Sequence, residues 1–530
     1  MSCPDQIAAA SAPSLEGTPP PNSFRLAVKD NIATYSEDGK GLPTTCASGI
    51  LSSHDSPFEA TIVKQLKARG AHVVGKTNLD EFGMGTHSVN SAHGAVAQLL
   101  VRDVKAEADN DKNNNTTRLS AGGSSGGSAV AVRSGAADVA LGTDTGGSVR
   151  LPAAYCGVVG YKPSYGMLSR HGVVPYANSL DTVGLLARDV RALRDLVVGG
   201  RLHLEHDPRD PTSLSAPARA RCTAASAAGG WWNDCGLEGE EEGGQSRRRR
   251  QQLLRPLTFG IPVEYNIAEL DPCVRDAWED AARVLRDEVG ARVVPVSLPS
   301  TRHALSAYYV IAPAEASSNL AKYDGVRYGI KQPDIEGNKN DNDNNNGSGG
   351  VLYSGVRGEG FGAEVKRRIL LGSYTLSSEA VDNYFVQAQR VRQLVRQDFD
   401  RVFRQPNPLR DGDDQRFPLS DMDEGVVLEN KLGPAQVDFL LCPTAPTLPP
   451  RLGDVESGQE RDPVGAYMND VFTVPASLAG LPAVSIPKGV KLPREEAWRG
   501  QGSMGLQVIG QYWDDARLLA AADALSALFK

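Results

Sequence analysis

The chain has 530 residues, and its content of 40% hydrophobic and 23% charged residues is ordinary for a soluble globular protein. Its net charge of −8 argues against a protein that binds nucleic acid across its whole surface. The seven cysteines are scattered and form no C-x-x-C pair, so neither a disulfide framework nor a zinc site is predicted.

The N-terminus, residues 1–23, is rich in Ala, Ser and Pro, and we expect it to be poorly ordered. It has no basic segment followed by an apolar one, so it is not predicted to be a secretory signal. It also lacks the arginines of a good mitochondrial presequence. No apolar run in the chain approaches the length of a transmembrane helix, and we expect no membrane insertion.

Residues 24–530 are predicted to form a single domain in which strands and helices alternate. The apolar spacing predicts strands at Phe24–Val28, Ala71–Gly75 and Val139–Gly142, and helices at Pro57–Arg69, Asp271–Val289 and Ser378–Phe403. Alternation of this kind is typical of an α/β fold, in which helices cover both faces of a central sheet.

Three polar, low-complexity inserts interrupt this domain, near residues 101–117, 214–254 and 337–350. They cannot bury enough apolar surface to offset the entropy of ordering, so we expect exposed, poorly ordered loops. The second insert contains four consecutive arginines, 247–250, which are compatible with a nucleic-acid or nuclear-import patch. A solvated loop is the favoured interpretation, because the same insert carries the acidic run 240–242.

Two glycine–serine runs, Gly122–Ser128 and Asp144–Ala154, are the strongest chemical signals. A phosphate-binding loop is one alternative, but no lysine follows the glycines as a G-x-x-x-x-G-K-[ST] motif requires. A plain turn is the other, since glycine permits tight turns without further function. Two such runs in one stretch are hard to explain as turns alone.

The second run offers what a serine nucleophile needs, namely a hydroxyl on a tight turn and N–H donors for an oxyanion. Ser148 is the candidate nucleophile, preceded directly by Thr145, Gly146 and Gly147 as candidate donors. No histidine lies in either run, so we consider Lys29, at the end of an apolar strand, where burial would favour a neutral amine that can act as a base. For Lys29 taken alone, a surface lysine remains the alternative.

Three separated motifs, around Lys29, in the run Gly122–Ser128 and from Asp144 to Pro163, resemble those of the amidase signature family in the same order. This resemblance implies a mixed central β-sheet and a Lys–Ser–Ser triad. By resemblance, Lys29 is the general base, and Ser124 is the bridging serine, which follows a non-prolyl cis peptide bond. Ser148 is the nucleophile that forms an acyl ester, and backbone N–H groups from Thr145, Gly146 and Gly147 form the oxyanion hole.

Four further segments, residues 78–85, 308–311, 361–369 and 467–470, resemble the glutamine-hydrolysing members of this family. A site selective for free glutamine needs a cation for its α-carboxylate and an anion for its α-ammonium. We expect Arg368 to bind the carboxylate, Asp470 to bind the ammonium and Tyr308 to provide a third contact. Without the resemblance, Arg368 would be read as a helix-surface charge and Asp470 as a helix cap.

The resemblance also implies an assembly. Ammonia would pass to the B subunit of an amidotransferase, which uses ATP and Mg²⁺ to convert Glu-tRNA(Gln) to Gln-tRNA(Gln) and provides most of the tRNA contacts. Also implied are a mitochondrial location, a small C- or F-type subunit in the complex, and no metal or cofactor in this chain. The rivals are a stand-alone hydrolase of small or fatty acyl amides, with an apolar site, and a non-catalytic scaffold protein.

Overall fold

A computed structural model describes residues 7–8, 23–35, 42–99, 118–227, 244–330, 354–410, 436–457, 463–490 and 503–529. The inserts predicted near 101–117 and 337–350 lie outside these residues, as does nearly all of the N-terminus, residues 1–23. The exception there is strand β1 (Ile7–Ala8), which pairs antiparallel with Thr77 and Lys76.

The described residues form one large mixed sheet of eleven strands, in the order β1-β3-β2-β6-β8-β7-β12-β13-β11-β9-β10. Strands β3-β2-β6 and β11-β9-β10 run parallel within each group, and the pairs between the groups are antiparallel. Strands β4 and β5 form a separate two-stranded sheet. The strand bounds are β2 Phe24–Lys29, β3 Ala71–Thr77, β4 Ala97–Leu99, β5 Arg118–Ser120, β6 Val139–Asp144, β7 Val159–Lys162, β8 Thr182–Ala187, β9 Thr258–Pro262, β10 Arg292–Val296, β11 Phe439–Pro443, β12 Ala483–Gly489 and β13 Ser503–Ile509.

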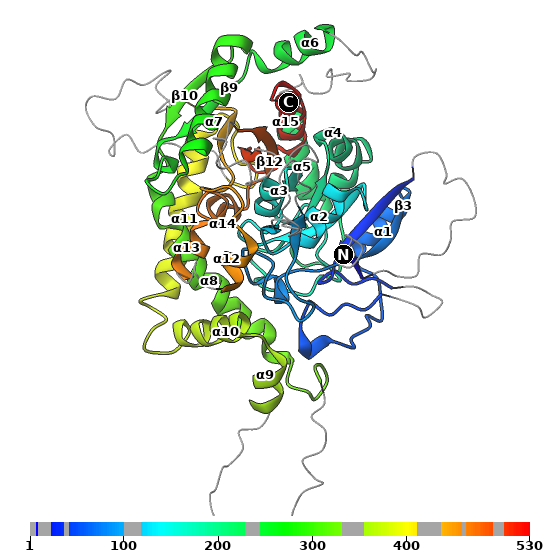
Figure 1. Cartoon of the computed structure of the whole chain (residues 1–530). Coiled ribbons are helices and arrows are strands. Elements are labelled where there is room, and N and C mark those ends of the chain that lie inside the picture. Colours follow the sequence, from blue (N-terminus) through cyan, green and yellow to red (C-terminus); the bar gives the residue numbers. More distant parts are fainter. Residues whose placement is uncertain are drawn as a thin grey trace, which may run out of the picture.

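Fifteen α-helices lie in the described part of the chain, and α6 and α9 lie at opposite ends of the molecule (Figure 1). No helix there is both long and apolar enough to cross a membrane. The helix bounds are α1 Thr61–Lys67, α2 Gly126–Ser134, α3 Arg150–Cys156, α4 Val190–Arg194, α5 Ala216–Ala227, α6 Gly244–Leu254, α7 Pro272–Arg283, α8 Ala304–Asn319, α9 Ser354–Gly360, α10 Ala363–Thr375, α11 Phe385–Val402, α12 Leu452–Ser457, α13 Pro463–Met468, α14 Val474–Ala479 and α15 Asp515–Leu528.

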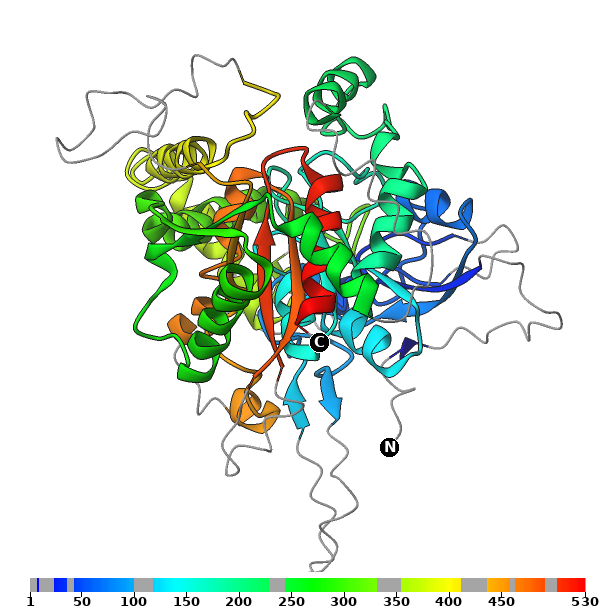
Figure 2. The ribbon, with the colours of Figure 1, turned by 90° about the horizontal axis from the view of Figure 1, so that it is seen from above.

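Side chains along β2 and β6 alternate between two buried faces of the sheet. Ala27 and Ala140 join a small cluster with residues of α2 and α3, which pack closely on these small side chains. Leu26, Val28 and Leu141 belong to the larger core, which also contains side chains of α1, α4 and α15. In Figure 2, α15 lies alongside β12 and β13. The predicted α/β fold, with helices on both faces of a mixed sheet, is confirmed.

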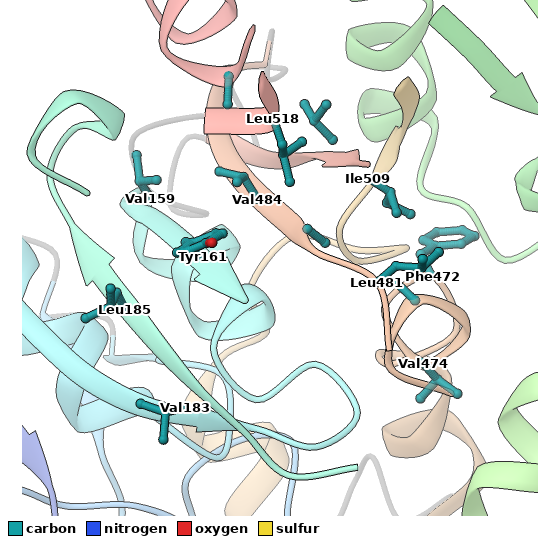
Figure 3. Packing of buried hydrophobic residues seen from close by; sticks show 14 of the residues in the cluster. Val159, Tyr161, Val183, Leu185, Phe472, Val474, Leu481, Val484, Ile509 and Leu518 are labelled. Carbon is teal, nitrogen blue, oxygen red and sulfur yellow. The ribbon is translucent and has the colours of Figure 1, made fainter. Parts of the chain in front are cut away.

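The centre of the larger core is formed by strands that are distant in sequence. Figure 3 shows Tyr161 of β7, Leu185 of β8 and Val484 of β12 packed around the same region as Ile509 of β13 and Leu518 of α15. All five side chains are buried. This packing joins the first and last thirds of the chain into one hydrophobic core, as a single domain requires.

The predicted strands are all present, but β2, β3 and β6 each extend beyond the predicted end, to Lys29, Thr77 and Asp144, and the helix predicted at Pro57–Arg69 spans only Thr61–Lys67. The helix predicted at Ser378–Phe403 begins only at Phe385, and the one predicted at Asp271–Val289 ends in a π-helical turn, Val284–Val289. These ends depend on hydrogen bonds to other elements, which apolar spacing does not encode.

The insert predicted near 214–254 contains helices α5 and α6 where we expected loops. The reason is that this segment does bury anchoring side chains. Arg219 of α5 donates to the carbonyl oxygens of Gly166 and Met167 at 3.0 and 2.9 Å, and Leu254 of α6 is part of the core. The arginine run therefore lies on a helix, and its first member, Arg247, pairs with Glu288 at 3.1 Å.

Candidate active site

Lys29 ends strand β2 and has no exposed surface. Its Nζ lies 2.7 Å from Ser124 Oγ, 2.9 Å from Ser125 Oγ and 2.9 Å from Thr143 Oγ1. Burial lowers the pKa of Lys29 to about 7, and the surrounding carboxylates, of which Asp80 acts most strongly, offset only part of this effect. The alternative of a surface lysine is therefore wrong.

The hydroxyl groups around Lys29 are consistent with a neutral amine, which has two N–H donors and one acceptor lone pair. Ser125 Oγ can donate to the carbonyl oxygen of Thr143, at 3.4 Å, and Thr143 Oγ1 accepts from Asn31 Nδ2 at 3.1 Å. If the two N–H groups of Lys29 point to Ser125 and Thr143, its lone pair remains for the hydroxyl of Ser124. This assignment leaves Ser124 as the proton donor to the base.

The two glycine–serine runs lie side by side. Ser124 follows a cis peptide bond after Gly123, as the family resemblance implies, and the N–H of Ser125 donates to the carbonyl oxygen of Ser148 at 3.1 Å. Ser148 is 9% exposed, whereas Ser124 is 1% exposed. Of the three predicted triad residues, Ser148 is thus the one that a substrate can reach most easily, which suits a nucleophile.

A buried ion pair holds the turn that carries Ser148. Arg150, at the start of α3, donates to both carboxylate oxygens of Asp144 at 2.8 and 2.9 Å. Burial alone would raise the pKa of Asp144, but Arg150, together with the charge of Lys162 and the N–H of Val149, outweighs this effect and the pKa is lowered. Arg150 also donates to the carbonyl oxygen of Thr473 at 2.9 Å. The pair therefore ties the nucleophile's turn to the segment that contains Asp470.

Two glycines bring this turn against the predicted substrate-binding residues. A Cβ on Gly146 would lie 2.7 Å from Cζ of Tyr308, and a Cβ on Gly147 would lie 2.8 Å from Oδ1 of Asp470. Neither position has room for a side chain. Thr145 is fixed separately, because its hydroxyl donates to Asp181 Oδ1 at 2.7 Å. Of the predicted oxyanion donors, Gly146 therefore lies next to Tyr308 and Gly147 next to Asp470, and Thr145 directly precedes them.

Arg368 points inward from helix α10 and is 3% exposed, so the alternative of a helix-surface charge is wrong. Its Nε donates to Glu364 Oε1 at 2.8 Å, and its Nη1 donates to the hydroxyl of Tyr176 at 2.6 Å. The guanidinium also lies over the rings of Tyr176, Tyr309 and Tyr467, at 5.4 to 5.9 Å from their centroids. In the part of the chain that the structure describes, no partner takes the other N–H of Nη1 or those of Nη2, so these are donors for a ligand carboxylate.

Asp470 lies just before helix α14 and is buried. The N-cap residue of α14 is Thr473, so the alternative of Asp470 as a side-chain cap is wrong. Its carboxylate accepts a long hydrogen bond, 3.5 Å, from the hydroxyl of Tyr309. Burial raises the pKa of Asp470 to about 7, and repulsion from Asp144 adds to this effect. A ligand ammonium at this carboxylate would relieve both penalties.

Several residues around this site were not predicted. Ser125 and Thr143 lie within the predicted runs or beside them, so their proximity to Lys29 had a signal in the sequence. Tyr309 and Glu364, which surround Arg368, lie in the segments 308–311 and 361–369 that carry the family resemblance, whereas Tyr176 had no signal. Tyrosines in these positions are equally typical of a hydrophobic core, and only the folded chain brings them to one guanidinium.

The family comparison covers nearly the whole chain. A family model described as Amidase matches residues 6–519. The chain belongs to the amidase family. The resemblance drawn from the three motifs is confirmed, and the separated motifs of this family are the ones that meet around Lys29 in the structure.

Among its relatives are three fungal proteins, each named as the A-type subunit of a mitochondrial glutamyl-tRNA(Gln) amidotransferase. The protein of Neurospora crassa is 59% identical over 95% of this chain and 90% of its own length. That of Podospora anserina is 60% identical over 95% and 89%, and that of Emericella nidulans is 48% identical over 94% and 88%.

Solved structures give the same result for the fold. The A-type subunit of the glutamyl-tRNA(Gln) amidotransferase of Thermotoga maritima is 32% identical with a TM-score of 0.61, covering 94% of this chain and 82% of that one. A 6-aminohexanoate cyclic dimer hydrolase is 20% identical with a TM-score of 0.63, covering 96% and 85%, and it shares the fold alone. One amidase fold thus carries different substrates, and the substrate must be argued from the site.

Proposed function

We propose that this chain is the glutamine-hydrolysing subunit of a mitochondrial amidotransferase that converts Glu-tRNA(Gln) to Gln-tRNA(Gln). The observation that carries the proposal is a buried aspartate, Asp470, beside the glycine turn that leads to Ser148, and a buried arginine, Arg368, that shares the contact with Tyr309. An opposite pair of charges suits a zwitterionic amino acid. Arg368 also pairs with Glu364, whereas Asp470 is in no ion pair with another described residue and is costly to bury without a ligand cation. The names of the fungal relatives support the same activity and the mitochondrial location.

In the proposed reaction, neutral Lys29 takes the proton of Ser148 through Ser124. Ser148 Oγ attacks the side-chain amide carbon of glutamine, and N–H groups of the turn 145–148 stabilise the oxyanion. The C–N bond then breaks, and the leaving nitrogen takes the proton back through Ser124 to depart as ammonia. Water hydrolyses the γ-glutamyl ester by the same relay. The sum is glutamine plus water to glutamate plus ammonia.

Glutamine recognition would use the guanidinium of Arg368 and the carboxylate of Asp470. The free donors of Arg368 fit the α-carboxylate, and Asp470 fits the α-ammonium. Tyr308 packs against the turn at Gly146 and would limit the space for the side-chain amide of glutamine. A stand-alone hydrolase of apolar amides has no use for the buried charges of Arg368 and Asp470, and this observation favours glutamine over that alternative.

The ammonia would be consumed by a B-type partner subunit, in which we expect ATP and Mg²⁺ to activate the glutamate on tRNA(Gln). The same proposal includes tRNA contacts made mainly by this partner, and a small C- or F-type subunit in the complex. The names of the relatives support an assembly of this kind. We propose no metal or cofactor for the reaction in this chain, since a buried lysine and backbone N–H groups supply its base and its oxyanion site.

The test is reconstitution of the full-length chain with its partner subunits. We expect glutamine-dependent amidation of Glu-tRNA(Gln), and loss of this activity with Ser148→Ala unless free ammonium replaces glutamine. Rescue by ammonium shows that the variant assembly is intact and lacks only the ammonia supply. A complex that hydrolyses simple apolar amides but not glutamine would contradict the proposal.

A further inference from the structure

Asp80 is a fully buried carboxylate that the reaction above does not use. It begins the segment 80–90, here called the Asp80 loop. Its Oδ2 accepts the N–H of Ser88 at 2.9 Å, and its Oδ1 accepts the N–H of Asn90 at 3.0 Å. These two bonds close the loop around its own carboxylate.

The Asp80 loop is bound to the run that carries Ser124. The N–H of Asp80 donates to the carbonyl oxygen of Ser124 at 3.3 Å. Ser88 Oγ donates to the carbonyl oxygen of Gly122 at 2.8 Å and accepts the N–H of Gly126 at 3.1 Å. Three hydrogen bonds therefore hold the serine run, one at Ser124 itself and one on each side of it.

The carboxylate also fills the space between two glycines. A Cβ on Gly85 would lie 2.5 Å from Asp80 Oδ1, and a Cβ on Gly123 would overlap Asp80 Oδ2. Gly123 directly precedes Ser124. The carboxylate therefore packs against the backbone of the serine run, and neither glycine has room for a side chain.

We propose that Asp80 is a positioning residue for the triad, whose loop holds Ser124 in place and whose carboxylate puts a buried negative charge against the run that contacts Lys29. This inference rests on the proposed role of Lys29. The charged or titratable groups that act on the pKa of Lys29 are Asp80, Asp144, Asp181 and Cys46, and Asp80 raises it most. Asp144 is neutralised by Arg150.

The ionisation of Asp80 itself is compatible with this role. Burial raises the pKa of Asp80 to about 6, while the N–H donors of Asn90 and Ser88 and the charge of Lys29 oppose this effect. At neutral pH the carboxylate is therefore mostly ionised. Neutral pH lies close to this pKa, so a change in the charge of Lys29 can change the ionisation of Asp80.

The test uses Asp80→Asn in the full-length protein, with the labelling rate of Ser148 by a fluorophosphonate measured as a function of pH. We expect the rising limb of the plot of labelling rate against pH to move to lower pH by about half a unit. This is less than the shift of one to three units that a carboxylate in direct contact with a charged group produces. The shift is expected because losing the carboxylate lowers the pKa of Lys29. The plateau rate should also fall, since Ser124 is held less firmly.

Asp210→Asn is the matched control. Asp210 is also buried and also accepts two backbone N–H groups, from Arg170 at 2.7 Å and Thr212 at 2.9 Å. It is not among the groups that act on the pKa of Lys29. This variant should lose stability without moving the rising limb, which separates a loss of loop structure from a loss of charge beside Lys29.

If Asp80→Asn does not fold, Gly85→Ala tests the position of the carboxylate while keeping its charge. We expect labelling of Ser148 to slow by about tenfold to a hundredfold, because the new methyl group displaces Asp80. An unshifted limb in a folded Asp80→Asn, or an unchanged rate in Gly85→Ala, would overturn the inference. A wild-type protein whose Ser148 is not labelled would overturn the proposed function, and this inference with it.

Discussion

The two halves of the candidate site are built differently. Lys29, Ser124 and Ser148 lie at the ends of β2 and β6 and in the turns beside α2 and α3, where neutral hydroxyl groups surround the lysine. Arg368 and Asp470 come from α10 and from the segment before α14, where buried charges are surrounded by tyrosines. The first half suits a neutral base held rigidly by the sheet, and the second suits a ligand that brings opposite charges.

The largest effect is expected in the first half. Ser148→Ala should lower glutamine hydrolysis by about 10⁴-fold or more, because the acyl ester cannot form. The melting temperature should stay near that of the wild type, since Ser148 Oγ has little packing to lose. Ser128→Ala is the control: its hydroxyl, on α2, bonds the carbonyl oxygen of Leu141 at 2.9 Å and Thr77 Oγ1 at 2.7 Å but makes no hydrogen bond to Lys29, and activity should persist. A Ser148→Ala protein with the wild-type rate contradicts the assignment.

Lys29→Met should lower the hydrolysis rate by about 10² to 10⁴-fold, the usual contribution of a general base. It should also change the pH dependence of stability. The pKa of Lys29 is about 7 in the folded chain against 10.5 for a free lysine, so the wild-type free energy of unfolding rises with pH across this window. Chemical denaturation should show a smaller rise in Lys29→Met. Part of the remaining rise is due to Lys162, whose pKa burial also lowers to about 7, and part to Lys76, whose pKa burial lowers as well.

In the second half, Arg368→Lys should raise KM for glutamine by about tenfold to a hundredfold, because a lysine cannot bind a carboxylate in two places or stack between tyrosines. Labelling of Ser148 by a small fluorophosphonate should hardly change. Arg367→Lys is the matched control, since Arg367 is the next residue on α10, is exposed and also pairs with Glu364. Equal effects of both variants on KM would count against a role of Arg368 in binding.

The smallest expected effect is a difference in pH dependence between glutamine hydrolysis and labelling of Ser148. This difference distinguishes the first half of the site from the second. Both Lys29 and Asp470 must lose a proton for glutamine to react, and the pKa of each is about 7. Well below pH 6, log kcat/KM for glutamine should therefore rise with a slope of about 2. The labelling rate of Ser148 needs only Lys29, so its slope should be about 1. Asp470→Asn should reduce the glutamine slope to about 1, and an unchanged slope would contradict the assignment.

In the first half, local residue patterns pointed to Ser148 as a candidate nucleophile and to Lys29 as a possible buried base, whereas the roles of Lys29 and Ser124 were assigned through the family resemblance. Ser124 and Ser148 follow glycines, and Lys29 ends an apolar strand. The second half was predictable only through the family resemblance. Tyr176 and Arg368 are 192 residues apart and form a hydrogen bond of 2.6 Å, which no local pattern can indicate. The alternation of strands and helices along the chain predicted a sheet covered by helices on both faces. The order of the strands could not be predicted, because it depends on long-range packing.

The most direct test is a search for the acyl ester. The assembled protein is mixed with glutamine, quenched in acid within its first turnovers and digested, and the peptide masses are measured. We predict a γ-glutamyl adduct on the peptide that contains Ser148, and none on the same peptide of Ser148→Ala. Consumption of glutamine with no adduct on Ser148, or with an adduct on another residue, would contradict the assignment of Ser148 as the nucleophile.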